Sequence, residues 1–553
     1  MRVEPCPVPL LPPLYAAYVD RRPEALGRFE ADPWDAGTWR RRLAALAATR
    51  PLRLDAAAVA EALRAFNREI GADERAMASI DAIAAGAPVV VGGHQATLFG
   101  GPLFVFLKAL SVLRLAEDLS ARLGERVVPV FWIAGEDHDF AEVGGLYALR
   151  PDWTIEKIAL EPPNPERRLS VSRLHLSEAA LREAADRLAA TWPETEFKPA
   201  AEALLRDAVA GGGSLVQVFG RLMARLFAGT GLVFLDSDDP RLRAVERPAF
   251  RRLIEAAPAV REALAAGAAG VRDLGFSPQL DAADGAYLFL HTEATGRVGL
   301  RFAGDGFSDR RGEHRFSTAE LLALAEAAPE RLSTAAGTRP IMQEMLFPVL
   351  AAVLGPSEVA YWAELKEAFR ALRLVLPPAV PRFQATVVEP SLARALEDVG
   401  GEAHRAVANP AYIEACQAAW LEAQGTARRL EERFQEIRRA IEALYAPLVA
   451  ELAALEKGLG PMAEENLRKI LGHVDFLAAR ALQAEKRRLD GAARRFERIR
   501  QLLAPLDRTQ ERVIGPFHFI VRHGLEAWRE RWRSLSLPLD GRHHLVYWDG
   551  GGG

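Results

Sequence analysis

The sequence predicts an α/β fold, in which helices cover a mainly parallel sheet, followed by a long helical hairpin. An apolar β-branched run at 89–91 leads into a glycine-rich turn and then a helix-periodic segment, 103–119, which together form a strand-turn-helix unit. Apolar runs at 126–134 and 231–235 are typical of buried parallel strands, and each leads into a cluster of acidic residues. From about residue 405, apolar residues recur at alternating spacings of four and three, as in a coiled coil.

Length, charge and cysteine content narrow the class of protein. A chain of 553 residues exceeds a single hydrophobic core, and its net charge of −4 argues against general nucleic-acid binding. Cys6 and Cys416 are too few for a disulfide framework and fit a reducing compartment. Residues 1–13 do not resemble a signal peptide, and no apolar run reaches the roughly 18 residues of a membrane helix. We therefore expect a soluble, cytoplasmic protein without a nucleic-acid or membrane partner.

The order of these patterns predicts a core that is interrupted twice. Residues 151–230 read as an insertion with a return helix, and alternating apolar residues at 271–316 as a small antiparallel sheet. The predicted segments are N-terminal helices with the first half of the core (1–150), a first insert (151–230), a core strand and helix (231–270), a second insert (271–335), the second half of the core (336–400), a coiled-coil hairpin (401–510), and a segment packing on the core with a disordered glycine tail (511–553).

The predicted hairpin has two arms, separated by a Gly-Pro turn at 458–461. The apolar seam of the first arm consists of Leu430, Phe434, Ile437, Ile441, Leu444 and Leu448. A hairpin of this composition is typical of a dimerisation or packing element, and less often of a clamp over a ligand.

The glycine-rich turn at 92–102 is the first candidate site. It lacks the Gly-Lys-Ser/Thr of a P-loop and the spacing of the dinucleotide fingerprint. The turn precedes a helix opening at Pro102, whose free N–H groups and dipole favour an anion such as a phosphate. His94 could donate to that anion and Gln95 and Thr97 could orient it; the backbone would be supplied by Gly92, Gly93, Gly100 and Gly101. The alternative is a tight turn in which His94 is an ordinary buried polar residue.

The segment Glu136, Asp137, His138 and Asp139 is the second candidate. Adjacent residues do not converge easily on one metal ion, so we predict no metal site. A carboxylate here could bind an amine, and His138 suits proton transfer near neutral pH. The alternative is a solvated loop that caps the next element. The acidic cluster 236–239, which begins with Asp236 after the next predicted strand, has either a site role or an N-cap role before a helix at 241.

A third group of candidates lies between 339 and 382. Gln343 begins the return to the core, and Gly355 could bring the backbone close to a ligand. Glu358 and Tyr361 follow at helical spacing and could line one wall of a site. Arg382 is a candidate partner for a substrate carboxylate.

Several blocks along the chain together resemble one known family. They comprise 92–95 through 100–102, 130–132 with 136–140, 235–240, 339–340 with Gly355, Pro356, Glu358 and Tyr361, 381–382, and 510–512. On these motifs the chain resembles the bacillithiol synthase family, the cysteine-adding enzymes of bacillithiol biosynthesis. It departs from the family pattern at His94, where a Gln-Gln or similar pair is frequent, and at Glu344, where Asp is frequent.

The resemblance implies a Rossmann-like parallel-sheet core with two connecting inserts and a C-terminal antiparallel coiled coil used in dimerisation. It also implies a ligase reaction that joins cysteine to the amine of glucosaminyl-malate to give bacillithiol.

Our mechanistic hypothesis is that ATP or a related nucleotide binds at the first turn and activates the carboxylate of cysteine, because amide formation from a free carboxylate in water needs activation. His94 would stabilise phosphate charge, and Asp137 and His138 would handle the amine or its proton. Glu358 and Tyr361 would position cysteine or malate.

Two alternatives remain open. The first is a nucleotide-binding scaffold or regulator without catalysis, whose coiled coil recruits a partner. The second is a tRNA-linked activity, suggested by analogy with the phosphate-contacting histidines of class I aminoacyl-tRNA synthetases. The near-neutral charge and the lack of a Lys-rich, Ser-containing signature loop disfavour it.

Overall fold

The computed structural model describes residues 1–280, 285–424 and 426–548. The chain forms two compact units, the first made of residues 1–387 and 509–546 and the second centred on residues 388–508. The first unit therefore contains the predicted core as far as residue 387, both inserts and most of the segment after the hairpin. Residues 388–400, which were predicted as core, belong to the second unit. The glycine tail predicted to be disordered, 550–553, lies outside the described residues.

The centre of the first unit is a five-stranded parallel sheet with the order β13-β12-β2-β3-β6. Its strands are β2 (Val89–His94), β3 (Val128–Ile133), β6 (Val233–Asp236), β12 (Val349–Leu354) and β13 (Ala379–Pro381). Numbered along the chain, the strands lie in the order 5-4-1-2-3, which is the order of a doubly wound, Rossmann-like sheet. The order reverses between β2 and β12, and ligands bind at the carboxyl ends of the strands beside such a reversal. The predicted α/β core is confirmed.

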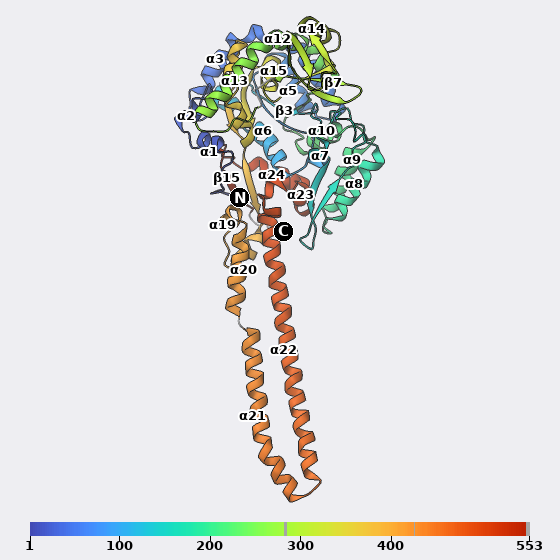
Figure 1. Ribbon diagram of the computed structural model, residues 1–553, viewed down its shortest axis with the longest axis vertical. Coiled ribbons are helices and arrows are strands. Elements are labelled where there is room, and N and C mark those ends of the chain that lie inside the picture. Colours follow the sequence, from blue (N-terminus) through green and yellow to red (C-terminus); the bar gives the residue numbers. More distant parts are fainter. Residues whose placement is uncertain (281–284, 425, 549–553) are drawn as a thin grey trace. The chain divides into compact units, whose positions relative to one another are not determined.

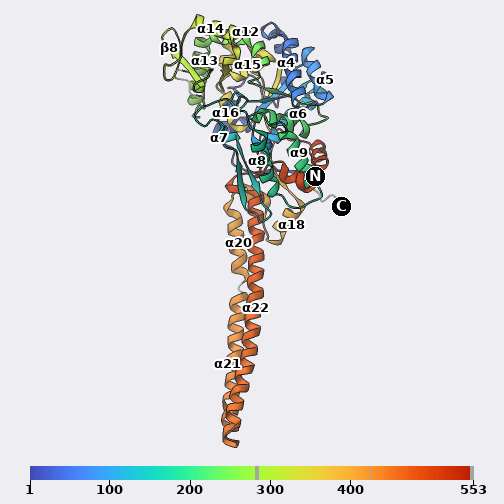
Figure 2. The same ribbon diagram turned by 90° about the vertical axis from the view of Figure 1, so that its right-hand side faces the viewer.

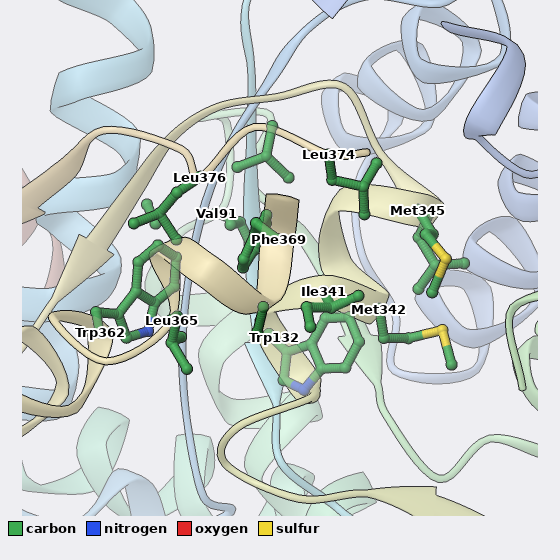
Figure 3. Close-up of a cluster of buried hydrophobic side chains, with 14 of the residues drawn as sticks. Val91, Trp132, Ile341, Met342, Met345, Trp362, Leu365, Phe369, Leu374 and Leu376 are labelled. Carbon is green, nitrogen blue, oxygen red and sulfur yellow. The ribbon is translucent and has the colours of Figure 1, made fainter. Parts of the chain in front are cut away.

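Helices bury both faces of this sheet, which explains why its strands read as continuous apolar runs. On one face Val91 and Trp132 pack with Ile341, Met342 and Phe369, a cluster that Figure 3 shows in close-up. On the other face, Phe131 lies 6.2 Å from the ring of Phe219, and α6 (Leu103–Leu123) crosses β2 and β3. Helix α6 follows Pro102 and ends at Gly124, whose φ of 68° needs a glycine. The predicted strand-turn-helix unit is therefore confirmed.

The two inserts differ in structure. The first contains the hairpin β4 (Gly145–Leu149) and β5 (Ile155–Ala159), and then α8 (Glu178–Ala190), α9 (Lys198–Val209) and the return helix α10 (Leu215–Leu226). The second contains an antiparallel sheet, β10-β9-β8-β7-β11, as predicted, with an edge strand β11 beyond the predicted region. Its strands are β7 (Gly285–Thr292), β8 (Gly296–Ala303), β9 (Gly306–Asp309), β10 (Arg315–Ser317) and β11 (Leu332–Thr334).

A small third sheet joins the two ends of the chain to the core. It has the order β1-β15-β14, made of β1 (Arg2–Cys6), β15 (His543–Tyr547) and β14 (Gln384–Val388). Helices α23 (Phe517–His523) and α24 (Leu525–Ser534) precede β15, and the Leu103 N–H donates to the carbonyl of Ile514 over 2.8 Å. The prediction that the C-terminal segment packs on the core is confirmed. The sheet itself was not predicted, because its strands lie far apart in the sequence.

The remaining helices of the first unit surround these sheets. The N-terminal helices are α1 (Pro13–Val19), α2 (Pro23–Leu26), α3 (Thr38–Ala48), α4 (Ala56–Glu69) and α5 (Glu74–Ala84). The others are α7 (Phe140–Val143), α11 (Pro240–Val245), α12 (Arg247–Glu255), α13 (Ala257–Asp273), α14 (Thr318–Ala327), α15 (Arg339–Leu346), α16 (Pro356–Trp362) and α17 (Lys366–Ala371). Within the described part of the chain, none of the helices is long and apolar enough to cross a membrane.

The second unit is helical. It consists of α18 (Pro390–Asp398), α19 (Ala403–Ala408), α20 (Ala411–Gln424), α21 (Thr426–Leu455) and α22 (Leu459–Leu503). Helices α21 and α22 lie side by side and antiparallel, as both Figure 1 and Figure 2 show in orange and red. The predicted hairpin is therefore confirmed, with its turn at 456–458 and α22 already begun at the predicted Gly-Pro break.

The seam of this hairpin is only partly the predicted one. Phe434 and Ile441 are half-buried, whereas Leu444 is 74% exposed, and Ile437 and Leu448 are exposed as well. The reason is that a straight helix repeats every 3.6 residues, so a seven-residue pattern drifts away from the contact line. Polar contacts also join the two helices of the hairpin. An example is the ion pair between Arg438 of α21 and Asp475 of α22, at 2.7 Å.

Candidate active site

A small pocket of about 340 Å³ lies where β2 and β12 end, at the reversal of the strand order. It is lined by Val91, Gly92, Gly93, His94, Trp132, Ala134, Arg339, Pro340, Gln343, Ala352, Val353, Leu354, Glu358 and Trp362. Of the predicted site residues, Gly92, Gly93, His94, Gln343 and Glu358 meet here. The pocket thus joins the first and third groups of candidates, although some 240 residues separate them in the sequence.

The glycine pair serves close packing as well as the pocket. A Cβ atom on Gly93 would lie 2.1 Å from the carbonyl oxygen of Trp132, and one on Gly92 would lie 2.6 Å from Cγ2 of Val112. Larger residues would therefore push β2 away from β3 and from α6. The absence of side chains also leaves the backbone of both residues as part of the pocket wall.

His94 presents a neutral imidazole to the pocket. Its Nδ1 lies 3.2 Å from the backbone carbonyl of Gln95, which can only accept a hydrogen bond, so Nδ1 carries the proton and Nε2 is an acceptor. Burial, reinforced by the nearby charge of Lys108, lowers the pKa of His94 to about 4. The ring packs edge-on against Phe104, with 5.0 Å between ring centroids. His94 therefore offers a hydrogen bond rather than a positive charge at neutral pH.

Two charged side chains, Glu358 and Arg339, line the same pocket as His94. The ammonium of Lys108, from α6, donates to Oε2 of Glu358, which also accepts the Gly355 N–H over 2.7 Å. Oε1 of Glu358 lies 3.9 Å from Nη2 of Arg339, and that same nitrogen donates to the hydroxyl of Tyr361 over 2.7 Å. Burial alone would raise the pKa of Glu358, but the charges of Lys108 and Arg339 outweigh it and hold that pKa below its usual value. Glu358 is therefore ionised near neutral pH.

The second group of candidates lies on the loop after β3. The side-chain amide of Gln95 donates to Asp137 over 2.6 Å and to Glu142 over 2.9 Å. Asp139 caps α7 by accepting the N–H of Glu142. His138 lies 3.5 Å from Nη1 of Arg297, an arginine of the second insert.

Burial and the charge of Arg297 lower the pKa of His138, so this imidazole is largely neutral near pH 7. Burial would raise the pKa of Asp137, but the hydrogen bonds from Gln95 and from the N–H of His138 lower it further than burial raises it. The loop thus places an ionised carboxylate beside a neutral imidazole.

Glu136 is the buried member of this loop. It is 4% exposed, and its Oε2 has no hydrogen-bond partner among the described residues. Burial raises its pKa, while the positive charges of Arg243, Arg297 and Arg339 act in the opposite direction. Glu136 is consequently a buried carboxyl group with one unpaired oxygen, near the arginine that lines the pocket.

Asp236 and Asp238 form a buried acidic pair at the end of β6. The hydroxyl of Ser172 donates to Asp236, and Arg173 pairs with Asp238 at 2.7 Å, so the first insert covers both carboxyl groups. Burial and the neighbouring charge of Asp238 raise the pKa of Asp236 to about 8. Asp236 thus holds together the core and the first insert and does not line the pocket. Asp239, in the same predicted cluster, caps the start of α11, as the helix-capping alternative predicted.

We expect the substitution Asp236→Asn to flatten the pH dependence of stability. Between about pH 4 and pH 8 the folded state holds a proton on Asp236 that the unfolded state has lost, so the stability that this group contributes falls as the pH rises. Urea unfolding at pH 5 and pH 8 should show a smaller loss of unfolding free energy in the variant, by on the order of a few kcal/mol. The exposed Asp305, changed to Asn, is the control. Equal losses in Asp236→Asn and the unchanged protein would contradict the assignment.

The remaining predicted residues lie outside the pocket. Thr97, Gly100 and Gly101 are buried beside the start of α6. The N–H of Leu103 donates to Ile514, and that of Val105 to Pro102, so the first turn of the helix has few free donors for a phosphate.

Arg382 is 2% exposed, and its two terminal nitrogens pair with both oxygens of Glu511, at 3.0 and 2.6 Å. Its guanidinium is therefore already neutralised by a carboxylate of the protein.

Comparison with known proteins decides the family. The model of the Rossmann-like N-terminal domain of the bacillithiol biosynthesis protein BshC matches residues 1–383, and that of its C-terminal coiled-coil domain matches residues 385–548. The chain belongs to the BshC family. Proteins named "Putative cysteine ligase BshC" from Geobacillus kaustophilus and Geobacillus thermodenitrificans are each 34% identical to it, over 99% of this chain and 100% of their own length. The protein of that name from Symbiobacterium thermophilum is 35% identical, over 89% of this chain and 90% of its own.

Membership of the BshC family confirms the resemblance inferred from the sequence motifs, and with it the ligase class and the pathway of bacillithiol biosynthesis. The boundary between the two family models, at 383–385, agrees with the change of unit near Val388. It lies before the start of the coiled coil predicted at 401, because α18 already belongs to the helical unit.

Three charged residues of this BshC-family site were not predicted as site residues: Lys108, Arg339 and Arg297. Lys108 carried a usable signal, because it is a single lysine in the apolar stretch 103–113 and is only 3% exposed. A buried lysine needs a carboxylate partner, but the sequence does not say which one.

Across residues 1–280, 285–424 and 426–548, the structure gathers no His, Cys, Asp and Glu group that could hold a metal ion.

Proposed function

We propose that this chain joins cysteine to the amine of glucosaminyl-malate, forming the amide bond of bacillithiol. The observation that carries the proposal is the pocket at the end of β2 and β12, which an ionised Glu358, Arg339 and a neutral His94 line together. The names of the relatives support the ligation of cysteine. A site with both charges and an uncharged hydrogen-bonding group suits substrates that carry amines and carboxylates.

The proposed roles follow from the contacts. Glu358 and Arg339 hold charged groups of a substrate, and Tyr361 fixes the guanidinium of Arg339 through its hydroxyl. His94 offers Nε2 as an acceptor for an N–H group, which favours the uncharged amine that attack requires. Asp137 and His138, on the neighbouring loop, handle the amine or its proton.

We also propose that ATP or a related nucleotide supplies the activation, since a free carboxylate does not form an amide in water unaided. The start of α6 does not fit a phosphate, because Leu103 and Val105 already donate to carbonyls and Thr97 is buried. The backbone at 92–93 and His94 line the pocket instead.

The test is reconstitution with purified protein, cysteine, glucosaminyl-malate and ATP. We expect bacillithiol, identified by mass spectrometry, together with consumption of ATP. Product formed without loss of ATP would overturn the nucleotide proposal alone. Nucleotide binding without any product would support the scaffold instead of the ligase. In cells, loss of the protein should remove the cysteine-capped thiol and lead to accumulation of its amine precursor. A sequence with only two cysteines suits a cytoplasmic enzyme.

We propose further that the coiled coil forms a homodimer. Leu444 and Leu477 are 74% and 60% exposed, and Ile437 and Leu448 of α21 and Phe476 of α22 are exposed as well. Spacings of seven and four place Ile437, Leu444 and Leu448 in one stripe along α21. Apolar side chains in such a stripe lose contact with water when a second hairpin covers them. A second copy of this chain offers the same stripe and therefore a symmetric interface.

The double substitution Leu444→Glu with Leu477→Glu should convert the dimer to a monomer. Charges on the stripe would be buried without partners in the dimer, which costs several kcal/mol. Sedimentation velocity should give the monomer mass for this variant and the dimer mass for the control Ala443→Glu, which changes an exposed position outside the stripe. A dimer that persists in the double variant would contradict this interface.

A further inference from the structure

We propose that Glu358 and Arg339 form a recognition site for the zwitterion of an α-amino acid, and that Lys108 is the positioning residue that keeps this site in place. The inference rests on the proposed function and names the substrate that takes this part of the pocket: cysteine, bound by its ammonium and carboxylate groups.

The first observation is that the two opposite charges face the pocket without forming a close ion pair. The nearest oxygen of Glu358 and the nearest nitrogen of Arg339 are 3.9 Å apart, and their side chains are 23% and 24% exposed. The buried pair Arg382–Glu511 differs in both respects. Nη2 of Arg382 lies 2.6 Å from Oε1 of Glu511, and the two side chains are 3% and 1% exposed. Glu358 and Arg339 therefore retain bonding capacity on the side of the pocket, and the other pair does not.

The second observation is how the bonding capacity of each group is divided. Oε2 of Glu358 is used by Lys108 and by the N–H of Gly355, which leaves Oε1 for a ligand. One nitrogen of Arg339, Nη2, donates to Tyr361. The rest of the guanidinium is available for a carboxylate, the group that its planar fork fits best. An ammonium beside Oε1 and a carboxylate beside Arg339 satisfy both groups at once.

Lys108 supports this arrangement without lining the pocket. It projects from the buried face of α6, one turn after Phe104, and its ammonium contacts Oε2 of Glu358. Since that contact stabilises the ionised carboxylate and fixes its rotation, Lys108 decides that Oε1 turns toward Arg339. Lys108 acts through Glu358 and is therefore a positioning residue.

The test is equilibrium binding to the full chain by calorimetry, without nucleotide, so that it does not depend on catalysis. L-cysteine and L-serine should both bind. N-acetyl-L-cysteine lacks the ammonium and cysteamine lacks the carboxylate, and each should bind at least about tenfold more weakly than L-cysteine. Equal binding of all four compounds, or no binding of either amino acid, would overturn the proposal. Amino-acid binding without amide formation would retain this site and refute the proposed ligase.

Substitutions assign the two halves of the site. Glu358→Gln should abolish the preference for L-cysteine over N-acetyl-L-cysteine, and Arg339→Gln should abolish the preference over cysteamine. Glu367→Gln, which removes an ion pair with Arg28 elsewhere in the first unit, should change neither preference. A different result would contradict the amino-acid site: glucosaminyl-malate displaces L-cysteine competitively, but Glu358→Gln leaves amino-acid binding unchanged. Glu358 and Arg339 would then bind glucosaminyl-malate and not cysteine.

Lys108 is distinguished from a purely structural residue by the pH dependence of binding. In Lys108→Met the affinity for L-cysteine should become pH-dependent between pH 5 and pH 8, falling as the pH falls, because Glu358 loses the charge that keeps it ionised. Lys108→Arg should restore the flat profile. A uniform loss of affinity at all pH values in Lys108→Met would overturn the positioning role. The ligand series on the unchanged protein decides the zwitterion site even if Lys108→Met does not fold.

Discussion

The substitution His94→Ala is expected to lower kcat/KM for bacillithiol formation by about 100- to 1,000-fold, the usual loss when one preorganised hydrogen-bonding group at a reacting centre is removed. His94 is held by Gln95 and Phe104 and lines the pocket at the reversal of the sheet. The loss should come mainly from kcat, because the imidazole is proposed to contact the attacking amine rather than to bind a charged group. Steady-state kinetics with each substrate varied would measure it.

The pH profile adds a second expectation for His94. Since burial lowers its pKa to about 4, it should contribute no limb to the profile of kcat/KM between pH 5 and pH 8. A limb near pH 6.5 that His94→Ala removes would contradict the neutral imidazole. His473→Ala, an exposed histidine on α22, is the matched control and should retain full activity. Full activity in His94→Ala would refute the catalytic role.

The substitution Gly93→Ala is expected to lower the unfolding free energy of the first unit by about 3 kcal/mol, the upper part of the range for overpacked interiors. The new Cβ would lie 2.1 Å from the carbonyl oxygen of Trp132, and β2 and β3 cannot separate without breaking the parallel ladder on which the pocket is built. Chemical denaturation followed by tryptophan fluorescence would measure the loss. Activity should fall as well, because Trp132 and Gly93 both line the pocket.

The control for this prediction is Gly299→Ala. Gly299 also lies in a strand of the first unit, but a Cβ there would have only ordinary contacts, the nearest 3.5 Å away on the ring of Phe289. Its unfolding free energy should change by less than about 1 kcal/mol. If Gly93→Ala and Gly299→Ala behave alike, close packing of β2 against β3 is not the reason for the glycine.

Some features of the site could be predicted from the sequence, and others could not. The strand-turn-helix unit at 89–123 was predicted because periodicity and glycine placement are local properties. The role of the glycines was only half predicted: the turn glycines suggested a phosphate, whereas the structure uses Gly92 and Gly93 to bring β2 against α6 and β3. The α6 terminus looked open because the segment that covers it, at Ile514, comes more than 400 residues later.

By itself the sequence determined the α/β class, the two inserts, the helical hairpin and the family. The first three follow from local periodicity, and the family follows from motifs that keep their order along the chain. Only the tertiary structure decided which residues meet. Lys108 joins Glu358 across 250 positions, Arg297 reaches His138 across 159, and the hairpin contact line leaves Leu444 exposed. The physical reason is that a residue type fixes what a side chain can bind, whereas long-range packing fixes its partner, its burial and its charge state.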